Sequence, residues 1–302
     1  MPALLGVDAG GSRTVAAAAD GTGTILARAE AGPGAVRPRR AGAAAAAIFS
    51  AGKDALQRAR LPGPAAVLVV GAAGAGHPEE QAALAAALEG CGLASRLIVT
   101  TDAEIALVAA FGEAPGIVIL AGTGSVAWAR LPDGASARAG GLGPVLGDRG
   151  SGHDIGREAL RTVGVDLEMG LELALTRRLL DHLGLNVPDL PRWTLTAQVA
   201  DIAALAPPVL DAAGDGDGVA RAIALQGARS LATLAAGLAR RFPEGERVAV
   251  AWGGGLLGRR PDYRLMVTEA VREFVPTAAV AAVAVDAPLG AIRMARTAAG
   301  IS

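Results

Sequence analysis

One acidic residue and two glycine turns are the features of this 302-residue sequence that could carry chemistry. The acid is Asp102, which follows a short apolar run, Leu97–Val99, and two threonines. The turns are Asp8–Thr14 (DAGGSRT) and Ala121–Ser125 (AGTGS), and each directly follows an apolar run. Glycines let backbone N–H groups approach an anion closely, and neighbouring hydroxyl groups add donors. The pattern indicates a phosphate site with an acid facing the phosphate.

The two turns offer the same kinds of groups. Asp8 stands where it could hold Mg²⁺ through water, since carboxylate oxygens are the ligands that this ion takes in proteins. The expected phosphate-binding residues are glycines and hydroxyl donors: Gly10, Gly11, Ser12, Thr14, Gly122, Thr123 and Gly124.

Simpler interpretations stay open for each feature taken alone. Asp102 can be only the N-cap of the helix that follows. Either glycine turn can be an ordinary hairpin without a ligand. Asp148, the acid within the glycine-rich run Ala139–Gly156, can be an Asx-turn residue.

The elements that must position these residues follow an order that occurs twice. Ala3–Val7 and Val15–Ala19 are predicted strands on either side of the first turn, and a third strand, Thr24–Ala29, follows a hairpin signal. Strands and helices then alternate until the strand Ile117–Leu120 restarts the order. This duplication predicts an α/β fold with two similar lobes.

The second half ends in a further glycine turn. The expected helices from Asp166 to Arg241 are broken at Pro207-Pro208, among other places, and the strand Val248–Trp252 follows. The next residues match G-x-G-x-x-G, but no acidic residue follows at the ribose distance, which argues against a dinucleotide site. A nucleoside-binding turn fits better, with Gly253, Gly254 and Gly258 as its residues. A last strand, Ala278–Val285, and a last helix, Pro288–Ala299, complete the expected elements.

Composition excludes several classes of protein. A net charge of −1 and an aromatic content of 3% argue against a nucleic-acid partner. Cys91 is the single cysteine, so one chain holds neither a disulfide nor a thiolate zinc site. We find neither a signal peptide nor an uninterrupted apolar stretch of membrane-spanning length, and we expect a cytoplasmic protein without a membrane partner.

These motifs together resemble the actin-like ATPase and sugar kinase superfamily, and within it the N-acetylglucosamine kinases grouped with the BadF/BadG/BcrA/BcrD ATPases. The similarity covers nearly the whole chain. Its motifs are two phosphate turns, a catalytic-acid motif, a glycine loop and an adenosine turn: Gly6–Thr14, Thr101–Ala103, Leu120–Ser125, Gly140–Gly152 and Trp252–Gly255.

The resemblance implies two ribonuclease-H-like (actin-like ATPase) lobes with a central cleft for nucleotide and substrate. The expected N-terminal lobe is 1–115, with 287–302 returning to it, and the C-terminal lobe is 116–286. It also implies an ATP-dependent and Mg²⁺-dependent phosphotransferase in which Asp102 takes the proton of the sugar hydroxyl. The implied sugar-binding residues are Ala35, Ala73, Asp102, Ser125, Gly141, Leu142, Gly143 and Asp148.

Three positions depart from the family pattern. Ala35 stands where an asparagine reads the sugar, Ala73 replaces a serine, and Arg149 replaces a glutamate. The expected acceptor is an amino sugar, N-acetylglucosamine or glucosamine, phosphorylated at its primary hydroxyl. The sequence leaves the oligomeric state open, with a homodimer among the expectations.

Rival functions on the same scaffold are an ATPase of the BadF/BcrA type without sugar kinase activity and a non-catalytic sugar sensor. A dehydratase activator needs two cysteines per chain at a dimer seam, and only Cys91 exists. A sensor or a chaperone-like ATPase would need an additional DNA-binding or peptide-binding domain, for which we see no segment.

Overall fold

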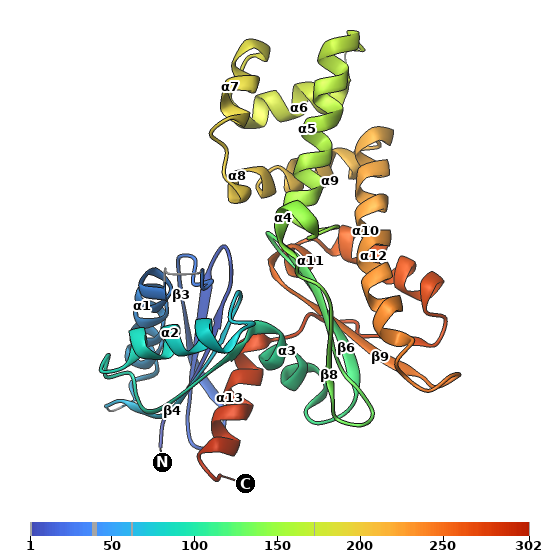
Figure 1. The fold of residues 1–302 in the computed structure, drawn as a ribbon. Helices are drawn as coiled ribbons and strands as arrows, with labels where there is room; N and C mark the ends of the chain where they lie inside the picture. Colours follow the sequence, from blue (N-terminus) through green and yellow to red (C-terminus); the bar gives the residue numbers. More distant parts are fainter. Residues whose placement is uncertain (1, 38–40, 62, 172, 302) are drawn as a thin grey trace. The chain divides into compact units, whose positions relative to one another are not determined.

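The computed structural model describes residues 2–37, 41–61, 63–171 and 173–301 (Figure 1). The chain forms two compact units. The first unit is Met1–Ala114 with Val285–Ser302, and the second unit is Pro115–Ala284. Each contains one five-stranded sheet.

The sheet of the first unit has the strand order β3-β2-β1-β4-β5. The first three strands form an antiparallel meander, whereas β4 and β5 run parallel to β1. The strands are β1 (Leu4–Ala9), β2 (Thr14–Ala19), β3 (Ile25–Ala31), β4 (Ala65–Ala72) and β5 (Ala94–Thr101). The carboxyl ends of the three parallel strands therefore meet at one edge of the sheet.

Helices cover both faces of this sheet because its central strands are apolar on both sides. Alternate residues divide between the faces: Leu5 and Val7 belong to one core cluster and Leu4 to the other. The first cluster includes residues of α1 (Ala41–Ala59) and α2 (Pro78–Leu88). The second includes residues of α3 (Asp102–Phe111) and α13 (Ala287–Ala298).

The C-terminal helix α13 packs very closely on the first unit, as Figure 1 shows for the red helix beside α3. A β-carbon on Gly290 would lie 1.8 Å from the carbonyl oxygen of Ile105, and one on Gly6 would lie 2.8 Å from that of Pro288. Only glycine leaves room for these contacts. The two glycines thus hold α13 against both α3 and β1.

The sheet of the second unit repeats the first, with the order β10-β9-β6-β7-β8. Numbered along its own unit, each sheet reads 3-2-1-4-5, with an antiparallel meander followed by parallel strands. The strands are β6 (Gly116–Ala121), β7 (Ser125–Arg130), β8 (Ser136–Gly140), β9 (Val248–Gly253) and β10 (Ala278–Val280). The predicted α/β class with two ribonuclease-H-like lobes is confirmed.

The helices of the second unit lie mostly between β8 and β9 in the chain. They are α4 (Gly143–Leu146), α5 (Gly152–Met169), α6 (Ala174–Leu183), the 3₁₀ helix η1 (Val187–Asp189), α7 (Leu190–Thr194), α8 (Val199–Ala203), α9 (Ala206–Gly214), α10 (Gly218–Ala239), α11 (Gly255–Arg259) and α12 (Pro261–Phe274). Within the described part of the chain, α10 alone has the length and apolar composition of a membrane span. Its buried face contributes residues such as Leu231 to the core of this unit, as expected for the core helix of a globular protein.

One predicted boundary was displaced and another was wrong. The helices are interrupted at 204–205, between α8 and α9, so the expected break lies directly before Pro207 and Pro208. These prolines occupy the first turn of α9, where a missing N–H removes no helical hydrogen bond. The last strand ends at Val280 rather than Val285, because its paired register with β9 covers Ala278–Val280.

Candidate functional site

The first glycine turn connects β1 to β2. The Gly10 N–H donates to the Arg13 carbonyl oxygen at 2.9 Å, which closes the turn. The Gly10 carbonyl oxygen in turn accepts the N–H groups of Gly34 and Ala35 at 3.0 and 3.1 Å. The loop after β3 is therefore bound to the back of the turn.

Ala35 and Ala73, two expected sugar contacts, both lie beside this turn. The Ala73 N–H donates to the Ala9 carbonyl oxygen at 3.0 Å, and its carbonyl oxygen accepts the Val36 N–H at 2.8 Å. Since the N–H of Ala35 is also engaged, neither alanine has an N–H left to donate. These two alanines could therefore offer a sugar their methyl groups and carbonyl oxygens but no N–H donor.

The hydroxyl groups of the first turn differ in their surroundings. Thr14 is fully buried, and its Oγ1 donates to the Gly32 carbonyl oxygen at 2.9 Å. Thr14 therefore supports the loop after β3. Ser12 and Gly11 are exposed on the turn, and Gly10 is half-buried.

Asp102 is the first residue of α3 and directly follows β5. Thr101, not Asp102, is the N-cap of this helix, and its hydroxyl accepts the Glu104 N–H at 3.1 Å. The Asp102 carboxylate accepts one neighbouring N–H, that of Ala103, at 3.0 Å. The simple interpretation of Asp102 as the N-cap is therefore wrong, because Thr101 caps the helix.

Asp8 and Asp102 lie at the same edge of the first unit's sheet. Asp8 of β1 is paired with Gly71 of β4, and the next residue of β4, Ala72, is paired with Thr101 of β5. Burial, followed by the charge of Asp102, raises the pKa of Asp8 to about 7. Burial also raises the pKa of Asp102. Two buried acids, one of which is held less readily charged by the other, form a fitting place for a cation.

The second glycine turn connects β6 to β7 and is closed by the Gly122 N–H, which donates to the Gly124 carbonyl oxygen at 2.9 Å. The first turn of α5 is bound to it. The Gly152 N–H donates to the Gly122 carbonyl oxygen at 2.8 Å, and the His153 N–H donates to that of Thr123 at 3.2 Å. The first turn of α5 thus supports the glycine turn, although each pair of bonded residues is 30 positions apart in the sequence.

Asp148 joins this turn to the glycine loop. It has a left-handed backbone conformation (φ +54°), and its carboxylate lies close to the backbone N–H groups of Ser125 and Gly143. A β-carbon on Gly124 would lie 2.7 Å from its Oδ2 atom. Burial raises the pKa of Asp148, while these N–H groups act in the opposite direction. Asp148 therefore bridges two segments and is not a simple Asx-turn residue.

Ser125 takes part in the same connection. Its side chain is buried, and its hydroxyl donates to the Arg149 carbonyl oxygen at 2.8 Å. The Ser125 carbonyl oxygen accepts the Gly141 N–H at 3.0 Å. Ser125 therefore holds the glycine loop in place, and Gly141 and Leu142 are among the exposed residues of this loop.

The expected nucleoside turn lies next to the second glycine turn. Gly253 ends β9 and is paired with Leu120 of β6. Gly254 has φ +86°, and a β-carbon there would lie 2.5 Å from the Ala121 carbonyl oxygen. Gly258 lies one helical turn further, where its N–H donates to the Gly254 carbonyl oxygen at 2.9 Å. These turns share the carboxyl ends of two parallel strands, where α/β sheets usually bind ligands.

Sequence reasoning missed two side chains here, His153 and Arg259. His153 is 6% exposed, and its Nδ1 atom has no hydrogen-bond partner among the described residues. Burial, followed by the charge of Arg157, lowers the pKa of His153. Arg259 follows the nucleoside turn in sequence. The sequence could have indicated both residues, because each is a basic or titratable residue within a few positions of a glycine-rich segment.

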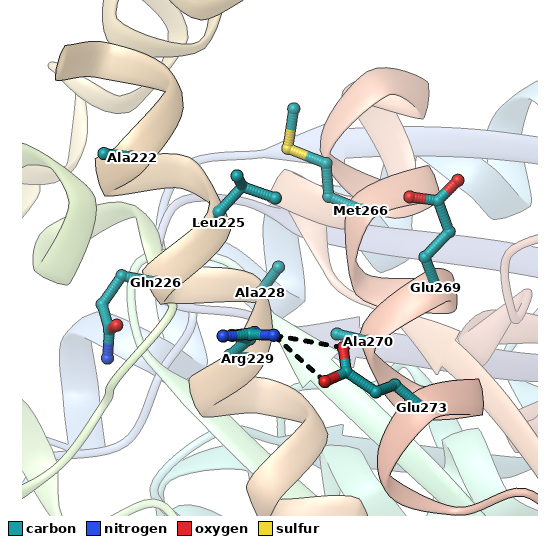
Figure 2. A pocket seen from close by; sticks show the side chains of 9 residues that line it. All are labelled: Ala222, Leu225, Gln226, Ala228, Arg229, Met266, Glu269, Ala270 and Glu273. Carbon is teal, nitrogen blue, oxygen red and sulfur yellow. Dashed lines mark hydrogen bonds and ion pairs between the residues drawn. The ribbon is translucent and has the colours of Figure 1, made fainter. Parts of the chain in front are cut away.

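A groove of about 390 Å³ lies elsewhere in the second unit, between α10 and α12 (Figure 2). Ala228 and Ala270 lie at its base, and an ion pair of 3.0 Å joins Arg229 to Glu273 across it. None of the predicted site residues lines this groove.

Two sheets with one strand order, each with a glycine turn after its first strand, define an actin-like ATPase and sugar kinase fold. The sequence model of the BadF/BadG/BcrA/BcrD ATPase family matches residues 5–292, and the chain belongs to this family.

Known relatives agree with this assignment. The N-acetylmuramic acid/N-acetylglucosamine kinase of Clostridium acetobutylicum is 34% identical over 168 residues, which are 54% of this chain and 55% of that protein. The N-acetyl-D-glucosamine kinase of Dictyostelium discoideum is 30% identical over 205 residues, or 65% and 64% of the two chains. The chain therefore spans between about half and two thirds of the length of these relatives.

Solved structures resemble the chain over nearly its full length. A Chromobacterium violaceum protein, named as a candidate N-acetylglucosamine kinase, has a TM-score of 0.81 and 29% identity, with 97% and 99% of the two chains covered. A ROK family glucokinase from Streptomyces griseus, solved with glucose and AMPPNP, has a TM-score of 0.59 and 19% identity, with 98% and 99% covered. The second protein shares the fold.

Proposed function

We propose that this chain is an ATP-dependent sugar kinase that phosphorylates an amino sugar at its primary hydroxyl. The observation that carries the proposal is that the Asp102 carboxylate does not cap the helix. Because Thr101 caps α3, the Asp102 carboxylate at the carboxyl end of β5 can take part in catalysis. It lies at the same edge of the sheet as Asp8. The names of the relatives support the same reaction class.

Asp102 is proposed as the general base that accepts the proton of the attacking hydroxyl. The raised pKa of Asp102 makes its carboxylate a stronger base than an ordinary aspartate. Such a base typically contributes about 10²–10⁴-fold to the rate. Alignment and electrostatic stabilisation supply most of the rest, because phosphoryl transfer needs little covalent help from protein.

The remaining proposed roles follow the turns in which the residues lie. The proposed phosphate-binding residues are Gly10, Gly11 and Ser12 in the turn after β1, and Gly122, Thr123 and Gly124 in the turn after β6. Gly253, Gly254 and Gly258 would receive the nucleoside. Gly141, Leu142 and Gly143 would contact the sugar, held in place by Ser125 and Asp148.

The residues present fit a magnesium ion. Among the described residues, no cluster of three or more acids, histidines or cysteines could enclose a metal, whereas Mg²⁺ commonly uses one or two carboxylates together with substrate phosphates and water. Asp8 would hold the ion through water. When bound, Mg²⁺ would neutralise charge on the phosphates.

The acceptor we propose first is N-acetylglucosamine, with glucosamine second. A free carboxylate in the sugar site would favour an ammonium group, but the backbone N–H groups of Ser125 and Gly143 already stabilise the charge of Asp148. Ala35 and Ala73 supply no side-chain hydrogen bond, and each missing bond typically weakens binding by about 0.5–1.5 kcal/mol. Affinity for the sugar should therefore be modest.

Cellular location and assembly are part of the same proposal. A cytoplasmic enzyme fits a chain whose single cysteine, Cys91, is free. A homodimer is the assembly we would test first.

The test is an acceptor screen with purified protein, ATP and Mg²⁺. ADP release is measured with N-acetylglucosamine, glucosamine, N-acetylmuramic acid and glucose, and phosphorus NMR locates the new phosphate on the product. We expect turnover on an amino sugar and a phosphate on its primary hydroxyl. Sugar-independent ADP release would favour the alternative, an ATPase of the BadF/BcrA type, and sugar binding without turnover would favour a sensor.

A further inference from the structure

Three arginines surround the nucleoside turn, and two of them have evident structural partners. Arg260 forms ion pairs with Asp211 at 2.5 Å and Asp262 at 2.6 Å. Arg264 lies over the ring of Trp252, 4.3 Å from its centre. Arg259 forms no hydrogen bond, ion pair or ring contact with any described residue. No described residue therefore pairs with the charge of its guanidinium group.

The guanidinium group of Arg259 nevertheless lies against the turn. Its Nη2, Cζ and Nε atoms are 3.2, 3.9 and 3.9 Å from the position that a β-carbon on Gly255 would take. The turn itself consists of three glycines and has no side chain of its own. Arg259 thus places a polar side chain next to the expected nucleoside turn, whose own residues can contact a nucleoside only through their backbone.

We infer that Arg259 binds the purine base of the nucleotide, with its planar guanidinium stacked on the face of the base. The inference rests on the proposed function, because it assumes that a nucleotide occupies this turn. Guanidinium groups stack on flat π systems within about 6 Å. The neighbouring Arg264–Trp252 pair uses the same kind of contact.

The position favours the base over the phosphates. The Gly122–Ser125 turn is the turn expected to bind phosphate, whereas the Gly253–Gly255 turn has no side chain to hold a base. Stacking of this kind contributes about 0.5–2 kcal/mol, or roughly 2- to 30-fold in affinity. Arg259 should therefore set the affinity for the nucleoside part of ATP.

Two substitutions distinguish a stacked base from a bound phosphate. Arg259→Ala removes both the plane and the charge, and Arg259→Lys keeps the charge but loses the plane. We expect both to weaken ATP and ADP binding by about 2- to 30-fold in calorimetry, with KM for ATP raised and kcat unchanged. Binding of inorganic tripolyphosphate, which has no base, should stay unchanged in both.

The matched control is Arg241→Ala, which removes an exposed arginine that lies beyond the end of α10 in the same unit. It should leave every one of these values unchanged. Rescue of ATP binding by lysine, or an equal loss of tripolyphosphate binding, would overturn the inference in favour of a phosphate contact. Unchanged ATP binding in Arg259→Ala would also overturn it. Absence of ATP binding by the unmodified protein would instead refute the proposed function itself.

Discussion

Replacement of Tyr263 by phenylalanine should destabilise the second unit by removing one buried hydroxyl. Tyr263 is the only tyrosine in the chain, is fully buried on α12, and donates to the Gly150 carbonyl oxygen at 2.8 Å. Gly150 belongs to the glycine loop and has φ +76°. Burial raises the pKa of Tyr263, so its hydroxyl remains a donor at every pH in ordinary use.

The expected cost follows from the buried carbonyl group that loses its donor. Such a group typically costs about 1–3 kcal/mol. For a domain of roughly 150–250 residues, each kcal/mol lowers Tm by about 2–4 °C, so the variant should melt roughly 2–12 °C lower. Scanning calorimetry of the purified protein measures this shift. KM for the sugar should also rise, because Gly150 lies between Asp148 and α5.

A second hydroxyl on α12 supplies the control. Thr268 donates to the Arg264 carbonyl oxygen one turn earlier, a group that belongs to the same helix. Thr268→Val removes this hydroxyl without leaving a buried carbonyl group unpaired and should cost less than about 0.5 kcal/mol. Equal melting temperatures for the two variants would refute the view that the Tyr263 bond holds the loop.

Two further predictions concern the packing of α13 and the histidine at the start of α5. Gly290→Ala should lower the free energy of unfolding of the first unit by about 1–3 kcal/mol or more, because the new methyl group meets the Ile105 carbonyl oxygen. The control Gly42→Ala, which adds a methyl group in open space on α1, should be neutral or stabilising. The lowered pKa of His153 means that the folded state resists its protonation, so this part of the stability is present above the unfolded pKa of about 6.5 and is lost as the pH falls below it. In melts between pH 5 and 7.5, His153→Asn should lose part of the acid sensitivity of the unmodified protein, and an identical pH profile would contradict this.

The sequence predicts the fold well because its signals are local. Short apolar runs followed by a glycine turn, such as Ile117–Leu120, favour buried strands, and these turns mark where the order begins again. Boundaries were less certain where position within a helix decides the outcome. Pro207 breaks a helix in its interior but is tolerated in the first turn, and the sequence does not say which turn it is.

The sequence predicted which segments form the candidate site, but not what each side chain in them contacts. Asp102 lies where the apolar run before it predicts, yet only the structure shows that Thr101 is the helix cap. The hydroxyl groups of Thr14 and Ser125 bind carbonyl oxygens 18 and 24 residues away. Contacts across such separations depend on how the strands pair, so residue type and spacing cannot assign them.

The central claim is that Asp102 is the base of a sugar kinase, and substitution by asparagine tests it most directly. Asp102→Asn keeps the shape of the side chain and loses the basic oxygen, while Glu113→Gln, an exposed acid of the same unit, is the matched control. We predict that Asp102→Asn binds ATP nearly as the unmodified protein does but loses about 10²–10⁴-fold in sugar-dependent kcat, with Glu113→Gln unaffected. Turnover of Asp102→Asn within a few-fold of the unmodified protein would contradict the account.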